Sequence, residues 1–257
     1  MDLNLKNKRV FVSGGSKGIG LAIVRGFLSE GARVAFTSRN LSTLQTISKS
    51  LKQEFPEADI LYFDTDATDA KKTALVFDSI VNVWQGLDIV VSNVGDGRST
   101  PEVIQSDEQF DKTLKINLKS AENVVREFLR TNSEQTGSIC FISSITGLEA
   151  FGAPTDYSVA KAAVISLSKN LARKLAPNIR VNCIAPGNVY SPGGSWDEKM
   201  KQNPERIFNI IESTVPMKRF GTPDEIANVV LFLTSDKASF ITGSCVVVDG
   251  GQTVGNH

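Results

Sequence analysis

The stretch Arg9–Gly20, RVFVSGGSKGIG, joins a short apolar run to a glycine-rich turn, and a helical pattern follows directly. Gly14 lets the chain turn sharply, Gly18 lets backbone approach a phosphate, and Gly20 permits close packing of a helix on a sheet. The beginning of the helix then offers unpaired N–H groups and the positive end of its dipole. Glycine collects in many loops for steric reasons. Between a first strand and a first helix, however, this turn predicts a dinucleotide site.

The residues after the second apolar run favour one dinucleotide over the other. A carboxylate at this place binds the ribose 2′-hydroxyl of NAD, whereas an arginine accommodates the 2′-phosphate of NADP. The run Arg33–Thr37 continues as residues 38–40, SRN, with no acid within reach. Arg39 could bind the phosphate through its planar fork and Lys17 could add a point charge, although both also fit solvated surface residues. We expect NADP as the cofactor, with NAD less favoured.

Apolar runs of strand length alternate with amphipathic stretches of helix length along the whole chain. Several runs are continuous and β-branched, as in strands that helices cover on both faces. The alternation predicts an α/β fold, with a doubly wound, mainly parallel, seven-stranded Rossmann-type sheet. No Pro/Ser-rich linker or repeat interrupts it, so we expect residues 1–257 to form a single domain. The strand candidates are Arg9–Ser13, Arg33–Thr37, Asp59–Phe63, Asp88–Ser92, Ser138–Ile142, Arg180–Ile184 and Ser244–Val248, and the main helix candidates are Ile19–Ser29, Thr68–Trp84, Gln109–Arg130 and Tyr157–Ala176.

The composition excludes several classes of protein. Lys plus Arg and Asp plus Glu number 28 each, so no overall field attracts nucleic acid or an anionic membrane. The first residues lack the apolar stretch of a secretion signal, and no run is long enough to span a bilayer. The three cysteines lie in apolar runs, as buried free thiols do in a reducing compartment. We expect a cytoplasmic protein that binds neither nucleic acid nor a membrane.

The scarcity of histidine restricts the chemistry. The only histidine is His257, the last residue, which removes Ser/His and Cys/His nucleophilic mechanisms and argues against a zinc site. Proton transfer must then come from Tyr, Lys, Asp or Glu. Tyr157 and Lys161 are four residues apart in a helical pattern, so the phenol and the ammonium share a face. A nearby cation favours phenolate and lowers the pKa of a tyrosine from its usual value of about 10.

By itself, the pair of Tyr157 and Lys161 would be explained as two neighbouring surface residues. Other polar residues in the sequence, however, accompany this pair. Ser143 and Ser144 end a strand candidate, at the edge where open parallel sheets bind ligands. Asn117 interrupts an apolar helical stripe, and a buried amide there needs hydrogen-bond partners. Its simpler role is helix packing with a local hydrogen bond. Together these residues predict an active site at the ligand-binding edge.

The motifs together resemble the short-chain dehydrogenase/reductase family over essentially the whole chain. The family's glycine turn corresponds to Ser13–Gly20, its N-N-A-G segment to residues 92–95 (SNVG), and its P-G-x-I-x-T segment to residues 186–191 (PGNVYS). Its Y-x-x-x-K motif corresponds to Tyr157–Lys161. The departures are Ser in place of Thr at the start of the glycine turn, and Ser92, Val94 and Ser191. Val94 adds bulk beside the cofactor groove.

The resemblance implies hydride transfer between nicotinamide and a carbonyl or secondary alcohol, with Tyr157 exchanging the proton. Ser144, thirteen residues before the tyrosine, would hold the substrate oxygen. Lys161 would lower the pKa of Tyr157 and bind the nicotinamide ribose, Asn117 would anchor a water leading to solvent, and no metal is required. The implied catalytic residues are Asn117, Ser144, Tyr157 and Lys161. The implied cofactor-binding residues are Gly14, Ser16, Lys17, Gly18, Ile19, Gly20, Ser38, Arg39, Asp66, Ala67, Asn93, Gly95, Tyr157, Lys161, Pro186, Gly187, Val189 and Ser191.

The segment Asn188–Thr214 follows a strand candidate and is rich in charge and glycine. Its position predicts a lid over the substrate, with Gly193 and Gly194 as the flexible point. Trp196 or Tyr190 would then lie against the ligand. A packed segment at a subunit contact is the alternative interpretation.

Two other functions share this fold. One is a non-catalytic NADP-binding sensor or scaffold. The other is a nucleotide-sugar epimerase or dehydratase, although those chains usually carry a longer substrate domain than the 96 residues after Lys161. The resemblance is closest to 3-oxoacyl-thioester and sugar or polyol reductases. The resemblance also implies a small carbonyl or alcohol substrate. Together with apolar stripes on the helix candidates Gln109–Arg130 and Tyr157–Ala176, the resemblance implies a homo-oligomer, a tetramer.

Overall fold

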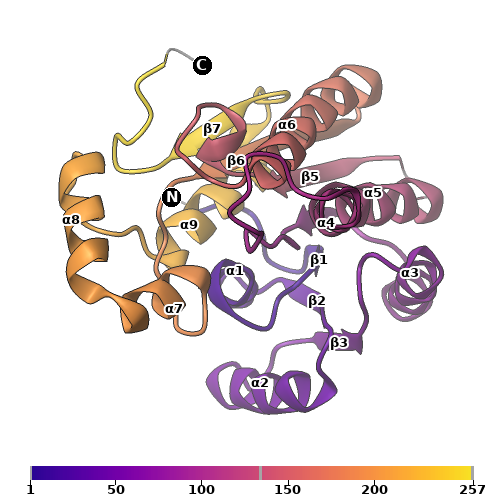
Figure 1. Ribbon diagram of the computed structural model, residues 1–257. Helices are drawn as coiled ribbons and strands as arrows, with labels where there is room; N and C mark the ends of the chain where they lie inside the picture. The colour runs from indigo at the N-terminus through magenta and orange to yellow at the C-terminus, as the bar shows by residue number, and fades with distance from the viewer. Residues whose placement is uncertain (1, 133–134, 256–257) are drawn as a thin grey trace.

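The computed structural model describes residues 2–132 and 135–255. In these residues seven strands form one parallel sheet in the order β3-β2-β1-β4-β5-β6-β7 (Figure 1). The predicted fold class is confirmed, and each strand lies within two residues of its predicted bounds. The strands are β1 Arg9–Val12, β2 Arg33–Ser38, β3 Ile60–Asp64, β4 Ile89–Ser92, β5 Gly137–Ile142, β6 Ile179–Pro186 and β7 Cys245–Val248.

Helices cover both faces of the sheet (Figure 1). One core contains Val10 and Val12 of β1 with apolar residues of α1, α2 and α9, and the other contains Phe11 with apolar residues of α3, α5 and α6. Successive side chains of a strand point to opposite faces, which explains why neighbours in β1 enter different cores. The helices are α1 Gly18–Ser29, α2 Leu41–Glu54, α3 Ala70–Trp84, α4 Asp107–Leu114, α5 Ser120–Thr131, α6 Thr155–Leu175, α7 Ser195–Gln202, α8 Pro204–Thr214 and α9 Pro223–Thr234.

The strand order reverses between β1 and β4. From β1 the chain winds outward through β2 and β3, and it then returns to pair β4 against the other side of β1. The loops after β1 and β4 therefore leave the sheet in opposite directions and open a crevice at the carboxyl ends of these strands. Such a switch point is where open α/β sheets bind ligands.

The predicted helix Gln109–Arg130 has a different form in the structure. A π-helical turn, Lys115–Lys119, separates α4 from α5, and the N–H of Ser120 donates to the carbonyl of Lys115, five residues earlier. Turns of this kind insert an extra residue into a helix and occur often at functional sites. Here the turn contains Asn117.

The cysteines lie in three neighbouring strands as free thiols. Cys140 and Cys183 are buried as predicted, whereas Cys245 on the edge strand β7 is partly exposed. Within the described residues, no helix combines the length and the apolarity needed to cross a membrane.

Candidate active site

One cavity of about 580 Å³ lies where the strands end. It extends from the glycine turn after β1 and the chain after β2 to the beginning of α6 and to α7 and α8. Every residue predicted to bind the cofactor lines this cavity, and so do Ser144, Tyr157 and Lys161. Asn117 is 1% exposed and lies outside the lining. The fold therefore brings the predicted cofactor-binding residues together with Ser144, Tyr157 and Lys161 from distant parts of the chain.

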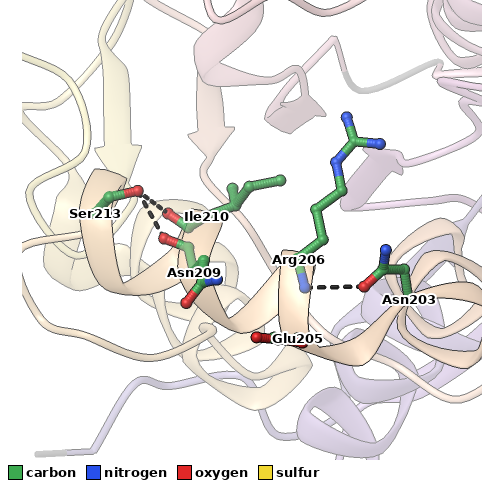
Figure 2. A pocket seen from close by; sticks show the side chains of 6 residues that line it. All are labelled: Asn203, Glu205, Arg206, Asn209, Ile210 and Ser213. Atoms are coloured by element: carbon green, nitrogen blue, oxygen red, sulfur yellow. Dashed lines mark hydrogen bonds between the residues drawn. The ribbon is translucent and has the colours of Figure 1, made fainter.

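A second hollow, of about 390 Å³, lies on α8, and Figure 2 shows the side chains around it. Its hydrogen bonds are local to the helix: Asn203 accepts from the N–H of Arg206 at 3.0 Å as an N-terminal cap. The hydroxyl of Ser213 donates to two carbonyls one turn earlier. Among the described residues, only this helix and its cap line the hollow. The candidate active site is therefore the larger cavity.

Lys161 is buried beside β5 with its ammonium at the end of that strand. The residue is 3% exposed, and its Nζ donates to the carbonyl of Ile142 at 3.0 Å. Burial disfavours the charged form and lowers the pKa of Lys161 to about 8. A Cβ added to Gly95 would lie 2.8 Å from this Nζ, so the ammonium can occupy its place only because residue 95 is glycine.

The two consecutive serines after β5 have different partners. Ser143 donates to the backbone carbonyl of Lys161 at 2.8 Å, so its hydroxyl is used to fix α6 on β5. Ser144 lies at the cavity with Tyr157, accepts from the N–H and the hydroxyl of Thr146 at 3.2 and 3.1 Å, and acts on the phenol of Tyr157 toward a lower pKa. This geometry favours Ser144 over Ser143 as the residue that meets a substrate.

Burial raises the pKa of Tyr157 to about 12, and the carboxylate of Asp96 acts in the same direction. The hydrogen bond from Ser144 favours the phenolate but does not outweigh burial. The prediction that Lys161 lowers the pKa of Tyr157 is wrong for this structure. The ammonium lies 5.7 Å from the ring centroid, and its hydrogen bond goes to Ile142.

Asn117 holds the chain that follows β4. Its Oδ1 accepts from the N–H of Asp96, and its Nδ2 donates to the carbonyls of Asp96 and Thr113, each at 3.0 Å. Both protons of the amide are therefore used by the main chain. These bonds match the packing role with local hydrogen bonds, and the anchoring of a water by Asn117 stays a prediction.

The glycine turn has the geometry that a close-approaching phosphate requires. Gly14 has φ +70°, and a Cβ added to Gly20 would lie 2.1 Å from the carbonyl oxygen of Gly14. The amide of Asn93 donates to the carbonyls of Ser13 and Gly14 at 3.2 and 3.1 Å. Asn93 was predicted to bind the cofactor, and in the structure its side chain fixes the turn that would do so.

The chain after β2 carries one cation at the cavity. Ser38 accepts a hydrogen bond from Ser16 at 2.9 Å, which joins this segment to the glycine turn. Arg39 is exposed, lines the cavity, and forms no ion pair with any residue that the structure describes. Its guanidinium is therefore accessible to an incoming anion.

Comparison with known proteins decides the family. A family model described as Enoyl-(Acyl carrier protein) reductase matches residues 14–253, which include the glycines of the turn and all four predicted catalytic residues. The chain is a short-chain dehydrogenase/reductase. The resemblance found in the motifs is confirmed.

Relatives of known kind align over nearly the full chain. The chain is 32% identical over 253 residues to 3alpha-hydroxysteroid dehydrogenase of Mediterraneibacter gnavus, covering 97% of this chain and 98% of that protein. It is 32% identical over 254 residues to 3-oxoacyl-(acyl-carrier-protein) reductase FabG of Thermotoga maritima, covering 98% and 100%. L-sorbose reductase from Gluconobacter frateurii, complexed with NADPH and L-sorbose, superposes with a TM-score of 0.91 at 31% identity and 98% coverage of both chains.

These relatives are dehydrogenases and reductases, so the chain is an oxidoreductase of hydroxyl and carbonyl groups. The alternative of a non-catalytic scaffold finds no support among them. They are named for three different kinds of compound, a steroid, an acyl thioester and a sugar. Family membership therefore leaves the substrate open.

A buried carboxylate beside the tyrosine was not found from the sequence. Asp156 is 0% exposed and accepts from the hydroxyls of Ser99 and Thr113 at 2.7 and 2.6 Å and from the N–H of Tyr157 at 2.8 Å. Burial alone would raise the pKa of Asp156, but these hydrogen bonds outweigh it and hold the pKa below its usual value. The main-chain carbonyl of Thr113 also accepts from Asn117, so Asp156 connects α6, which carries Tyr157 and Lys161, to the end of α4 that Asn117 contacts.

The predicted lid consists of α7, α8 and the chain before them, and Figure 1 shows the two orange helices at the outer side of the fold. Trp196 lines the cavity. Tyr190 does not line it; instead its hydroxyl donates to Asp197 at 2.7 Å. Arg98, in the loop after β4, forms two hydrogen bonds to Glu198 of α7 at 2.6 and 3.1 Å. One exposed ion pair thus joins the segment to the opposite side of the site.

Proposed function

We propose that this short-chain dehydrogenase/reductase uses NADPH to reduce a ketone or aldehyde to an alcohol, with Tyr157 as the proton donor. The observation that carries this proposal is the position of Tyr157 at the cavity together with Ser144 and Lys161, and burial raises its pKa to about 12. A phenol with this pKa is protonated throughout the physiological range. It is therefore ready to give a proton, which is what carbonyl reduction requires.

The residues at the other end of the cavity fit a dinucleotide phosphate. α1 begins at Gly18 with neither a side-chain cap nor an acid in its first turn, so within the described chain its first N–H groups are open to an anion. Arg39 and Lys17 line the same end of the cavity. Arg39 would hold the 2′-phosphate of NADP, and the glycine turn would hold the pyrophosphate. When bound, NADPH supplies the hydride.

Residues of the chain itself then bind the substrate oxygen and donate a proton to it. Ser144 donates a hydrogen bond to the carbonyl oxygen and sets its place beside the phenol. Tyr157 donates its proton to that oxygen as negative charge develops there. The resulting phenolate is stabilised by Ser144, whose hydroxyl acts on the phenol toward a lower pKa. Asn117 and Asp156 act indirectly, because their hydrogen bonds fix the elements that carry these groups.

A purified sample with a panel of ketones and alcohols tests the proposal. We expect NADPH oxidation with at least one ketone, and a kcat/KM for NADPH at least about tenfold above that for NADH, because a charge-assisted hydrogen bond is worth about 1.5–3 kcal/mol. Equal use of NADH would overturn the assignment of Arg39. Tight binding of NADPH without turnover of any ketone or alcohol would overturn the catalytic assignment.

The segment Asn188–Thr214 supports a lid in this activity. Gly193 has φ +69°, and an added Cβ would meet nothing within 4 Å, so the chain can turn there without obstruction. Trp196 at the cavity and the exposed Arg98–Glu198 pair would close over the substrate. We expect limited proteolysis to slow when NADPH and substrate are present together. Equal cleavage rates would favour a packed segment instead.

Surface and thiol chemistry support our proposals for the assembly and the compartment. Leu129 of α5 and Val159 of α6 are partly exposed apolar residues, and they support contact between copies of the chain through these helices, as in a homotetramer. Light scattering that gave a monomer at micromolar concentration would contradict this. Free thiols in three neighbouring strands support a reducing compartment, the cytoplasm.

A further inference from the structure

The chain after β7 brings one glutamine to the active-site cavity. Gln252 lines the cavity together with Ser144 and Tyr157 and is 9% exposed. Its carboxamide oxygen is a buried polar atom that has no hydrogen-bond partner in the described chain. The hydroxyls of Ser138 and Ser168 share this property, but neither lines the cavity. A buried acceptor without a partner is unfavourable, and its place at a substrate cavity points to a donor on the ligand.

The backbone around Gln252 is fixed by a carboxylate. Asp249 accepts from the N–H of Gly251 at 2.9 Å and from the N–H of Thr253 at 2.6 Å, the two residues on either side of the glutamine. Gly250 and Gly251 have φ +66° and +84°, a conformation that residues with a Cβ rarely adopt. The turn therefore holds the Gln252 side chain toward the cavity rather than leaving it on a free tail.

A second carboxylate and the chain just after the lid hold the same segment. Glu149, in the loop that follows Ser144, accepts from the N–H of Val254 at 3.0 Å and from that of Gly255 at 2.6 Å. On the other side, the N–H of Met217, just after α8, donates to the carbonyl of Gly250 at 3.1 Å. In Figure 1 the yellow C-terminal chain accordingly passes the end of α8. The glutamine is thus held between the catalytic loop and the lid.

The surroundings of Gln252 restrict the chemistry of its partner. A carboxamide oxygen accepts, so the ligand group must donate. Asp249 accepts from the backbone on both sides of it and Glu149 from the backbone that follows, so an anionic ligand group would be repelled. Thr214 also lines the cavity, but its hydroxyl donates within α8 to Ile210 at 2.7 Å. A neutral hydroxyl group on the ligand suits this place.

We propose that Gln252 determines specificity by accepting a hydrogen bond from a hydroxyl group of a neutral substrate. The carbonyl of the same substrate is held by Ser144 and Tyr157, so the hydroxyl is a second group on the molecule. The substrate is therefore a hydroxyketone or a hydroxyaldehyde. This inference rests on the proposed carbonyl reductase activity and adds to it the class of substrate.

The test uses three matched series of methyl ketones of increasing chain length. The first series is unsubstituted (the plain ketones), the second carries a terminal hydroxyl, and the third carries a terminal carboxylate. We expect the natural protein to prefer the best hydroxyketone over its plain partner by about tenfold in kcat/KM, the effect of one neutral hydrogen bond. The carboxylates should be the poorest substrates. Gln252→Met keeps the length of the side chain and removes the acceptor. It should lower kcat/KM for the hydroxyketone about tenfold, mainly through KM, and leave the plain ketone almost unchanged.

Thr253→Val is the matched control, because the next residue in the same turn does not line the cavity. It should leave the hydroxyl preference intact, and both variants should keep the Tm and the NADPH affinity of the natural protein. An equal loss on plain and hydroxylated ketones in Gln252→Met would assign the residue a structural role and overturn the proposal. Reduction of plain ketones with no hydroxyl preference would also overturn it while leaving the proposed function in place. If NADPH is oxidised with neither series, the proposed function itself fails.

Discussion

The side chain of Asn117 holds the main chain of Asp96 by both of its polar groups, accepting from the N–H and donating to the carbonyl at 3.0 Å each. The π-helical turn places the amide at this point, and a third hydrogen bond to Thr113 ties it back to α4. Asp96 follows Gly95, which packs directly on Lys161 and Asn117. The amide therefore fixes the loop that forms one wall of the active site.

Asn117→Ala should destabilise the fold as well as reduce turnover. It removes three hydrogen bonds, each with a net contribution of about 0.5–1.5 kcal/mol, so we expect a loss of roughly 2–4 kcal/mol in the free energy of unfolding. Denaturant unfolding followed by circular dichroism measures this loss. Unchanged stability with lost activity would instead support the role of an anchor for a catalytic water.

Lys161 should make stability depend on pH in the alkaline range. Its pKa in the folded chain is about 8, below the ordinary 10.5, so the folded state binds fewer protons than the unfolded state between these values. Below pH 8 the fold carries the full cost of burying the ammonium, and this cost disappears as pH rises toward 10.5. The free energy of unfolding should therefore gain roughly 2 kcal/mol between pH 8 and 10 from this residue.

Lys161→Met isolates that contribution, because the titration of the other groups is common to both proteins. The difference in unfolding free energy between natural and variant chains, measured from pH 7 to 10, should change in favour of the natural chain as pH rises. Parallel profiles would show that Lys161 does not titrate with a lowered pKa.

The preference for NADPH should depend on Ser38, the last residue of β2, and on Arg39, which follows it. In the double variant Ser38→Asp, Arg39→Ala, a carboxylate replaces the phosphate-binding cation, and the preference should move toward NADH by roughly 10- to 150-fold. Ratios of kcat/KM for the two cofactors measure this change. Because Ser38 also accepts from Ser16, the single variant Arg39→Ala is the control, and it should weaken NADPH without strengthening NADH. An unchanged ratio in both would remove Arg39 from the site.

The parts of this molecule that the sequence predicts well are those set by local pattern. Continuous apolar runs such as residues 89–92 define the strands, and fixed motif spacing identifies Tyr157 and Lys161. The parts that it does not predict depend on contacts between distant segments. Glu149 meets the C-terminal chain about a hundred residues later, and this contact is one of those that hold Gln252 at the cavity.

The direction of the Tyr157 pKa shift illustrates the same limit. The spacing of Tyr157 and Lys161 puts a cation near the phenol, and this alone predicts a lowered pKa. The actual direction depends on burial of the ring and on the position of Ile142, whose carbonyl takes the ammonium. Neither can be read from one helix. The acid before the tyrosine, Asp156, was missed for a similar reason, since its partners lie on the loop after β4 and on α4.

Replacement of Tyr157 by phenylalanine tests the central claim most directly. The change removes one oxygen and keeps the ring, so packing and NADPH binding should survive. Ser144 is too weakly acidic to substitute as a proton donor. General acid–base catalysis supplies roughly 10²–10⁴ in rate, so kcat should fall by at least this factor. The measurement is kcat on the best ketone, with the NADPH dissociation constant determined on the same sample. The account predicts a loss of roughly a hundredfold or more at nearly unchanged NADPH affinity, whereas near-normal turnover by Tyr157→Phe would contradict it.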